Sequence, residues 1–344
     1  MTLRVLKLWD AAKLDGGAKG ADSKEFVPRR NGRLQFLSDH HTLVGGLDST
    51  MSSGVLCFWD TEAGRPRRAF SNLAPWVMAR VSPDEQSFAI AHPDGVVEIL
   101  SVTNQTVLAT LLGATNEVRN IFFTPDGRRV LTGTHGGLKD RGGVYWGDSV
   151  VRLWDAKSGR QLQATNLSAK VRGMTMAPPG ATFAVLLDDG SLEVRRTLDF
   201  ALVFRTHFNV KSAAMAFSPD GRVLAAGANF ENEVGVWDLS THQRRFTLRC
   251  TAAVNALAFT PDGLTLASGG EDRKVKLWSA ETGQEMVTLP QAGPVNQIAI
   301  SGDGRILAAG TSGSTQYRIN LIRPPSFDEI AAVEARERTE VMQP

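Results

Sequence analysis

The stretch VNALAFTPDGLTLASGGEDRKVKLWSAETGQEMVTL, residues 254–289, decides the fold. It contains four short runs rich in aliphatic, β-branched and aromatic residues, at 254–260, 264–270, 274–278 and 285–289, with no helical period. A Pro-Asp-Gly turn joins the first two runs, and a Glu-Thr-Gly-Gln turn joins the last two. The stretch therefore predicts a small antiparallel sheet of four strands.

The same pattern recurs along the chain. The third run ends on an aligned position that is most often tryptophan, and the eight aligned residues are Trp9, Trp59, Leu100, Trp154, Arg195, Trp237, Trp278 and Ile322. Neighbouring positions are 50, 41, 54, 41, 42, 41 and 44 residues apart. A propeller blade repeats about every 40–45 residues.

A turn marker repeats in phase with these positions. It is clearest as TPDG or SPDG, in which proline presets φ, aspartate bonds its own backbone and glycine accepts the left-handed conformation of a tight hairpin. Strong and weak copies lie at 38–41, 82–85, 124–127, 177–180, 218–221, 260–263 and 301–304. Two periodicities in one register indicate seven repeats.

A single four-stranded sheet with apolar residues on both faces must pack against neighbours, so the repeats are expected to close into a ring. The predicted fold is all-β: a seven-bladed β-propeller of four-stranded antiparallel blades, formed as one domain by residues 1–323. We expect a strand from within residues 1–30 to complete the last blade, with 3–9 and 22–28 as its two candidates. The blades are expected at approximately 31–75, 76–116, 117–169, 170–209, 210–252, 253–293 and 294–323.

These residues resemble the WD-repeat family over positions 1–323. The resemblance is carried by the hairpin marker and by KLWD at 7–10, CFWD at 57–60, RLWD at 152–155 and GVWD at 235–238. The family's Gly-His pair before the inner strand is absent, so its histidine-anchored hydrogen-bond network is not expected in the usual form. Asp189 and Asp272 keep the acidic position, which leaves partial networks open. We expect apolar packing to hold the blades together.

Residues 324–344 form a separate tail. Ser326 and Glu329 have the spacing of a capping box, and the Ala/Glu/Arg content predicts a short helix at about 326–340. This helix either packs on the last blade or couples to a partner. The ending is similar to bacterial WD-repeat regions attached to serine/threonine kinases, but no kinase signature is present, so kinase activity is not implied.

In propellers of this family, the resemblance places partners on the face built from the outer-to-inner and second-to-third strand loops. The longest of the second-to-third loops is the insertion THGGLKDRGGVYWGDS at 134–149. Aromatic and arginine side chains supply most binding hot spots. The candidates in this insertion are Lys139, Arg141, Tyr145 and Trp146; the alternative is a glycine-rich loop that only covers the channel mouth.

A second candidate site is the rim of the channel. Arg119, Asn255 and Asn296 each lie seven residues before a hairpin aspartate, and Arg172 has the equivalent position in the degenerate fourth repeat. Polar residues in otherwise apolar strands point to solvent or to a ligand, and the two arginines suit an acidic peptide. The alternative is a channel filled with water.

Composition limits the classes of function. A formal net charge of +2 gives no reason to expect nucleic acid or membrane as a partner. Cys57 and Cys250 are too few for a disulfide framework and are expected to be buried thiols of a reducing compartment. No signal peptide or spanning helix is found in the sequence, so we expect a cytoplasmic monomer with no cofactor and no metal.

The leading hypothesis is a non-catalytic scaffold that binds a protein or peptide, and the resemblance implies a bacterial-type regulatory setting. One alternative is a small-ligand or metal-dependent hydrolase or lactonase-type propeller enzyme. Its motifs are missing, the histidines form no metal-ligand pair, and the hairpin aspartates are expected to make turns. Another alternative is a structural repeat array, or a fragment of a larger regulatory protein.

Overall fold

Each repeat forms one antiparallel sheet whose strands pair in chain order. In the sixth, these strands are β21 (Val254–Phe259), β22 (Thr265–Gly270), β23 (Lys274–Ser279) and β24 (Glu285–Pro290). Each differs from its predicted run by one residue at one end. The computed structural model describes residues 34–49, 53–73, 78–114, 116–134, 149–207, 214–228, 232–312 and 317–323.

The other sheets are built in the same way, and the blades are numbered one to seven in chain order. Blade one contains β1 (Gln35–Phe36), β2 (Thr42–Ser49), β3 (Ser53–Asp60) and β4 (Arg65–Leu73), and blade two contains β5 (Met78–Val81), β6 (Ser87–Ala91), β7 (Val97–Ser101) and β8 (Val107–Leu111). Blade three contains β9 (Val118–Phe123), β10 (Arg129–Thr134), β11 (Val150–Asp155) and β12 (Gln161–Asn166), and blade four contains β13 (Val171–Met176), β14 (Thr182–Leu187), β15 (Ser191–Arg196) and β16 (Leu202–His207). Blade five contains β17 (Met215–Phe217), β18 (Val223–Ala228), β19 (Glu233–Asp238) and β20 (Gln243–Arg249), and blade seven contains β25 (Val295–Ile300), β26 (Leu307–Ser312) and β27 (Tyr317–Ile322).

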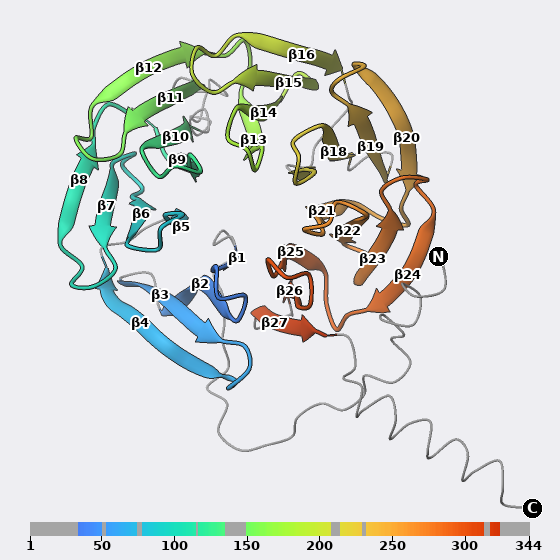
Figure 1. Ribbon diagram of the computed structural model, residues 1–344, viewed down its shortest axis with the longest axis horizontal. Helices are drawn as coiled ribbons and strands as arrows, with labels where there is room; N and C mark the ends of the chain where they lie inside the picture. The colour runs from blue at the N-terminus through green and yellow to red at the C-terminus, as the bar shows by residue number, and fades with distance from the viewer. Residues whose placement is uncertain are drawn as a thin grey trace, which may run out of the picture.

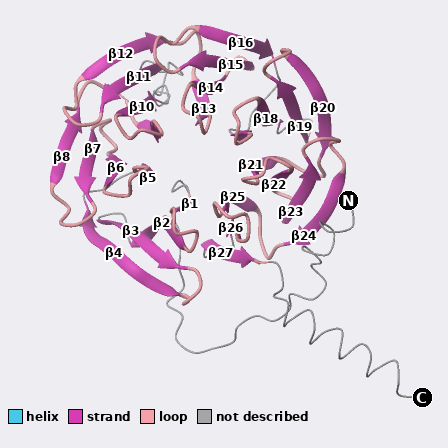
Figure 2. Cartoon of the chain, viewed as in Figure 1, coloured by secondary structure: helices cyan, strands magenta, loops and turns pink. Residues whose placement is uncertain are grey.

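The seven sheets stand around a central axis (Figure 1). The first strand of each blade lies nearest the axis, and the fourth strand follows the outer rim (Figure 2). The predicted all-β, seven-bladed propeller of antiparallel blades is confirmed. The fourth strand expected for blade seven from within 1–30 and the helix expected at 326–340 lie outside the described residues. Across the described ranges, no helix is long and apolar enough to cross a membrane.

A hydroxyl and a carboxylate fix the hairpin between the first and second strands. In blade three, Thr124 Oγ1 donates to Asp126 Oδ1 at 2.5 Å, and the same carboxylate oxygen accepts the backbone N–H of Arg128 at 3.0 Å. The predicted turn role of the hairpin aspartates is confirmed. The same hydroxyl–carboxylate pair recurs as Ser82–Asp84, Ser218–Asp220, Thr260–Asp262 and Ser301–Asp303.

The hairpin of blade one begins one residue earlier than the marker at 38–41 predicts. The backbone N–H of His40 donates to the carbonyl of Leu37 at 3.1 Å, and His40 has a φ of 62°, the conformation that Glu85 adopts in blade two and that glycine adopts in the hairpins of blades three to seven. Leu37 therefore takes the place of the serine or threonine, and Asp39 takes the place of the hairpin aspartate. Asp39 Oδ1 accepts the N–H groups of His41 and Thr42.

Neighbouring hairpins touch around the ring. Proline of one hairpin lies against glycine of the next, so that a Cβ added at Gly221 would lie 3.4 Å from Pro179 and one added at Gly263 would lie 3.4 Å from Pro219. Between blades seven and one both residues differ: Gly302 stands where proline is usual and His40 where glycine is usual, and a Cβ at Gly302 would lie 2.7 Å from the ring of His40. Blade one therefore packs directly on blade seven.

Apolar clusters fill the spaces between blades rather than the inside of any one blade. The cluster between blades two and three brings Ile99 and Leu111 against Ile121 and Trp154, all buried. Because both faces of a blade are covered in this way, burial of apolar surface supplies most of the stabilisation of the ring. This agrees with the expectation that apolar packing holds the blades together.

Part of a polar network survives beside this packing. The indole N–H of Trp154 donates to Thr132 Oγ1 at 2.8 Å, and the indole N–H of Trp278 donates to Ser268 Oγ at 2.8 Å. In blade six, the hydroxyl of Thr251 donates to Asp272, one of the two acidic positions named from the sequence. The two indole bonds tie the third strand to the second strand of the same blade, and the Thr251–Asp272 bond joins the segment before β21 to the turn between β22 and β23.

We expect Thr132→Val to lower the free energy of unfolding by about 1–2 kcal/mol. Valine keeps the shape of the buried side chain but leaves the indole N–H of Trp154 without an acceptor. Thermal unfolding of Thr132→Ser, which keeps the hydroxyl, is the control. A valine variant as stable as the parent would show that the bond adds nothing.

Blade four has an arginine at the aligned tryptophan position. Arg195 Nε lies 2.7 Å from Glu193 Oε2, and its Nη1 donates to the carbonyl of Phe200 at 2.9 Å. Arg205 Nη2, from the neighbouring outer strand, lies 2.5 Å from Glu193 Oε1, off the line of a hydrogen bond. Only 1% of the Glu193 side chain is exposed, so this buried carboxylate is paired with Arg195 of its own strand and with Arg205 of β16.

Candidate functional site at the central channel

The two candidate arginines of the rim lie at the start of inner strands, and their side chains reach solvent. Arg119 of β9 donates through Nε and Nη2 to Glu117 Oε2, at 2.9 and 2.7 Å. Arg172 of β13 donates to Asp188, a residue in the turn after β14. Each arginine is therefore held by a carboxylate of its own blade.

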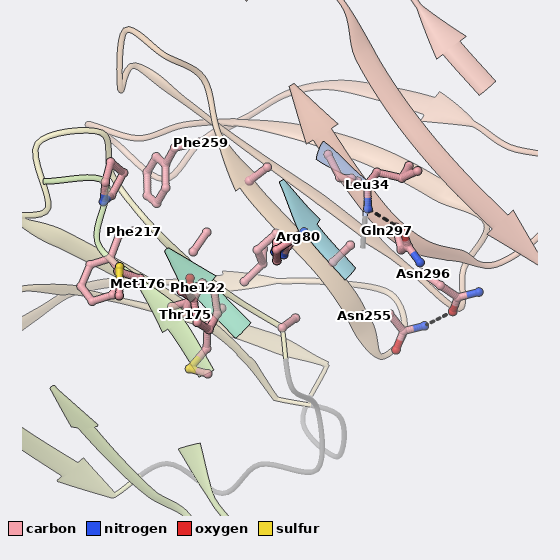
Figure 3. Close-up of a pocket in the computed structure, with 18 residues that line it drawn as sticks. Leu34, Arg80, Phe122, Thr175, Met176, Phe217, Asn255, Phe259, Asn296 and Gln297 are labelled. Carbon is pink, nitrogen blue, oxygen red and sulfur yellow. Dashed lines mark hydrogen bonds between the residues drawn. The ribbon is translucent and has the colours of Figure 1, made fainter. Parts of the chain in front are cut away.

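The two candidate asparagines link blades six and seven. Asn255 Nδ2 lies 2.8 Å from Glu271 Oε1 and 3.2 Å from Asn296 Oδ1 (Figure 3). The rim thus combines cations, carboxylates and amides, and is not a uniformly basic surface. An acidic segment that approached Arg119 or Arg172 would have to displace Glu117 or Asp188.

The other four candidates, Lys139, Arg141, Tyr145 and Trp146, lie outside the described residues. The insertion that carries them joins β10 to β11, since Thr134 ends the first of these strands and Val150 begins the second. Thr134 and Val150 lie on the same face of the ring as the rim residues, because inner strands begin and second strands end at that face. The hairpins lie on the opposite face.

Below the rim lies a cavity of about 360 Å³ between the inner strands. Arg80 of β5 is the one charged residue among the described residues that line it, and it is a residue that the sequence analysis missed. The strand places it there by alternation: Ala79 and Val81 are buried in the core against blade one, whereas Arg80 is half-buried and faces the channel. The signal was present in the sequence, because Arg80 lies four residues before Asp84, where other repeats have Phe122 and Ala258.

The hairpin aspartates and the two cysteines have structural roles. The hydrogen bond from Ser82 lowers the pKa of Asp84, and that from Thr124 does the same for Asp126. Burial raises the pKa of the Cys57 thiol and that of the Cys250 thiol to about 11, so both stay protonated and unreactive near neutral pH. Within the described ranges, no three His, Cys, Asp or Glu side chains are grouped so that they could hold a metal ion.

Three stretches of the chain match the family model described as WD domain, G-beta repeat: residues 105–155, 199–238 and 242–279. Each stretch ends on the third strand of a blade, directly after Trp154, Trp237 or Trp278. The chain is a β-propeller in which these three stretches are WD repeats. The first three strands of blade four, with Arg195 at the tryptophan position, lie outside the three matched stretches, whereas β16 falls within 199–238.

Among curated proteins, the WD-repeat propeller is similar to Protein groucho of Drosophila melanogaster, with 25% identity over 276 residues. The match covers 78% of this chain but 35% of groucho, so the chain spans about a third of the length of that relative. Among solved structures, a chain of the crystal structure of a mitotic checkpoint complex superposes with a TM-score of 0.71. The sequences are 18% identical, and the match covers 89% of this chain and 91% of that one, which shows a shared fold.

Proposed function

We propose that this WD-repeat propeller is a non-catalytic scaffold that binds a protein or peptide partner on the face bearing the second-to-third strand loops. One observation carries the proposal: the channel mouth on that face is ringed by charged and amide side chains above an open cavity. Concave sites with a few convergent polar groups are where ligands bind. The similarity to groucho and to a chain of a checkpoint complex supports an interaction role at the level of the family.

Layering of the inner strands supports this choice of face. At the first channel-facing position the residues are Arg119, Arg172, Asn255 and Asn296, whereas three residues further on they are Phe122, Thr175, Ala258 and Ala299. In these four blades polarity is therefore concentrated at one end of the channel, and Arg80 of blade two is the charged residue at the lower level. Charged and polar groups at an interface fix its specificity and orientation more than its affinity.

We expect the double variant Arg119→Glu/Arg172→Glu to reduce capture of the partner about tenfold, because charge reversal beside Glu117 and Asp188 makes the rim repel an acidic contact. The matched control is Arg222→Glu/Arg305→Glu, which makes the same charge change on the hairpin face, at side chains that are 79% and 81% exposed. Full chains are immobilised, the captured proteins are identified by mass spectrometry, and the affinity of the main partner is measured for each variant.

The outcome separates the two faces. Loss of affinity in the rim variant alone supports the proposal. Loss in the hairpin variant alone moves the site to the opposite face, and equal affinities in both variants and the parent rule out the channel rim. The cytoplasmic location, the monomeric state and the roles of Tyr145 and Trp146 stay predictions.

A further inference from the structure

The ladder between the first and second strands is interrupted at every candidate residue of the rim. Its register skips one residue of the inner strand in blades three, four, six and seven, and the skipped residues are Arg119, Arg172, Asn255 and Asn296. Each is therefore the extra residue of a β-bulge, which redirects a side chain out of the regular alternation of a strand. The backbone itself determines where these side chains point, and in blades six and seven the side chain is an amide.

Glu271 fixes the orientation of the two amides. An ionised carboxylate only accepts hydrogen bonds, so the atom of Asn255 that lies 2.8 Å from Glu271 Oε1 is the amide nitrogen Nδ2. The second hydrogen of that nitrogen is donated to Asn296 Oδ1 at 3.2 Å (Figure 3). Asn255 Oδ1 and Asn296 Nδ2 remain, and neither has a hydrogen-bond partner among the described residues. The pair therefore presents one acceptor and one donor.

An acceptor beside a donor matches the backbone of an extended chain. A residue of such a chain offers both its N–H and its C=O to a neighbour, whereas a helix uses these groups internally. A carboxylate has no donor to offer, and the exposed charge of Glu271 disfavours it at this part of the rim. Blades six and seven therefore suit a neutral peptide backbone, in contrast to the ion pairs of blades three and four.

Small and apolar side chains lie beneath the pair. The next channel-facing residue of β21 is Ala258, whereas blade three has Phe122 at the same level. Ala258 lines the channel cavity of about 360 Å³ together with the apolar residues Phe259 and Ile298. A cavity of this volume is at the small end of ligand sites, so it suits one apolar side chain of a segment rather than a folded domain.

We infer that Asn255 and Asn296 bind the backbone of one residue in an extended segment of the partner, and that the apolar side chain of this residue enters the cavity beside Ala258. The backbone N–H of the bound residue donates to Asn255 Oδ1, and its C=O accepts from Asn296 Nδ2. In contacts of this kind, backbone hydrogen bonds supply affinity and the pocket selects the side chain. The contact rests on the proposed function, because it describes the partner at the same rim.

Labelled heptapeptides and the full chain test the contact. The central residue is leucine in one pool and N-methyl-leucine, which lacks the backbone N–H, in the other; the flanking positions are the same random mixture of Ala and Ser. Fluorescence anisotropy is expected to show about fivefold tighter binding of the leucine pool, because one hydrogen bond contributes about that factor. Asn255→Leu is expected to bring the ratio of the two affinities to about one, whereas a ratio caused by the bulk of the methyl group would persist.

Two further variants separate the hydrogen bonds from each other and from unrelated effects. Asn296→Asp keeps the acceptor for Asn255 Nδ2 but replaces the donor by an oxygen, so it is expected to weaken both pools about tenfold and to leave their ratio unchanged. Asn166→Leu removes an exposed asparagine of the outer strand β12, away from the channel. It should bind both pools as the parent does.

A change in the cavity tests the place of the side chain. Ala258→Leu reduces the free volume, and the ring should tolerate it because blade three carries the larger Phe122 at the same level. The melting temperature is therefore expected to stay near that of the parent. The variant should bind the leucine pool about tenfold more weakly, and a pool with glycine at the centre as the parent does.

The contact is overturned if the parent binds the leucine and N-methyl-leucine pools equally, if Asn255→Leu keeps their ratio, if Ala258→Leu binds the leucine pool normally, or if neither pool binds at about 1 mM. The proposed function fails separately. Partner capture that is lost in Arg119→Glu/Arg172→Glu but normal in Asn255→Leu supports the binding face and overturns the contact. Normal capture by the double arginine variant, with the peptide ratio as expected, places the binding face of the scaffold elsewhere.

Discussion

Glu193→Ala is expected to lower the free energy of unfolding by about 3 kcal/mol, since removing one member of a buried ion pair leaves the other charge without compensation. The group left behind is Arg195, whose side chain is only 20% exposed and is fixed in the place that tryptophan takes in other blades. The Arg205 side chain is 50% exposed and can be hydrated when Glu193 is removed. The expected loss of stability is therefore at the lower end of the range for buried ion pairs. Differential scanning calorimetry should show the melting temperature falling by about 4 °C.

Two further variants separate the buried charge from mere loss of volume. Glu193→Met/Arg195→Met replaces both charges by flexible apolar side chains, and it is expected to recover most of the lost stability, because an apolar pair can replace a buried ion pair at little cost. Glu98→Ala removes the residue at the equivalent strand position of blade two, where 30% of the side chain is exposed, and is expected to change stability by less than about 1 kcal/mol. A double variant no more stable than Glu193→Ala would show that the side-chain volume, not the unpaired charge, decides the loss.

The ring was predictable because its signals are local and repeat. The aspartate of a TPDG or SPDG turn bonds its own loop, so Asp126 and Asp262 act alike wherever the marker stands. The register failed at the first hairpin for the same reason: Leu37–His40 contains neither proline nor glycine, and the positive φ of His40 leaves no mark in composition. His40 takes the glycine position of its hairpin, and this is evident only from its contact with Gly302, which lies more than two hundred and fifty residues away in the chain.

The site was predictable in outline but not in its charges. Counting from the hairpin aspartates placed Arg119 and Arg172 at the starts of inner strands, where the structure has them. Spacing along one strand says nothing of the side chain that comes from a neighbouring loop, so the carboxylates of Glu117 and Asp188 were not anticipated. Arg80 was missed because the comparison of repeats covered only the positions seven residues before each hairpin aspartate, and Arg80 lies four residues before Asp84.

The pair between Glu193 and Arg205 shows a further limit of sequence. These residues are opposite each other in the register of β15 and β16, and a bulge interrupts that register between Val194 and Arg195. A shift of one residue would turn the arginine to the other face of the sheet. The buried charge in blade four therefore depends on the exact turn that precedes β16, which the sequence pattern alone does not determine.

The second large loss of stability is expected from a substitution at Gly159, which lies in the turn between β11 and β12 and contacts a neighbouring blade. Its φ is 70°, and an added Cβ would lie 2.5 Å from the backbone oxygen of Thr110 in β8, the outer strand of blade two. Gly159→Ala therefore combines an unfavourable backbone conformation with a collision between a turn of blade three and the backbone of β8. We expect a loss of about 3 kcal/mol in the free energy of unfolding.

Gly283→Ala is the matched control, because it occupies the same position of the corresponding turn in blade six and has a φ of 72°. There the added Cβ would lie 2.8 Å from Cδ2 of Phe246, a half-buried ring that can rotate, so the expected loss is about 1–2 kcal/mol, close to the backbone cost alone. The difference between the two variants in the free energy of unfolding, measured with denaturant, gives the energetic cost of separating blades two and three at this contact. Equal losses would mean that blade three can move away from β8 freely, and that the ring is held by its inner strands and apolar clusters rather than by its outer turns.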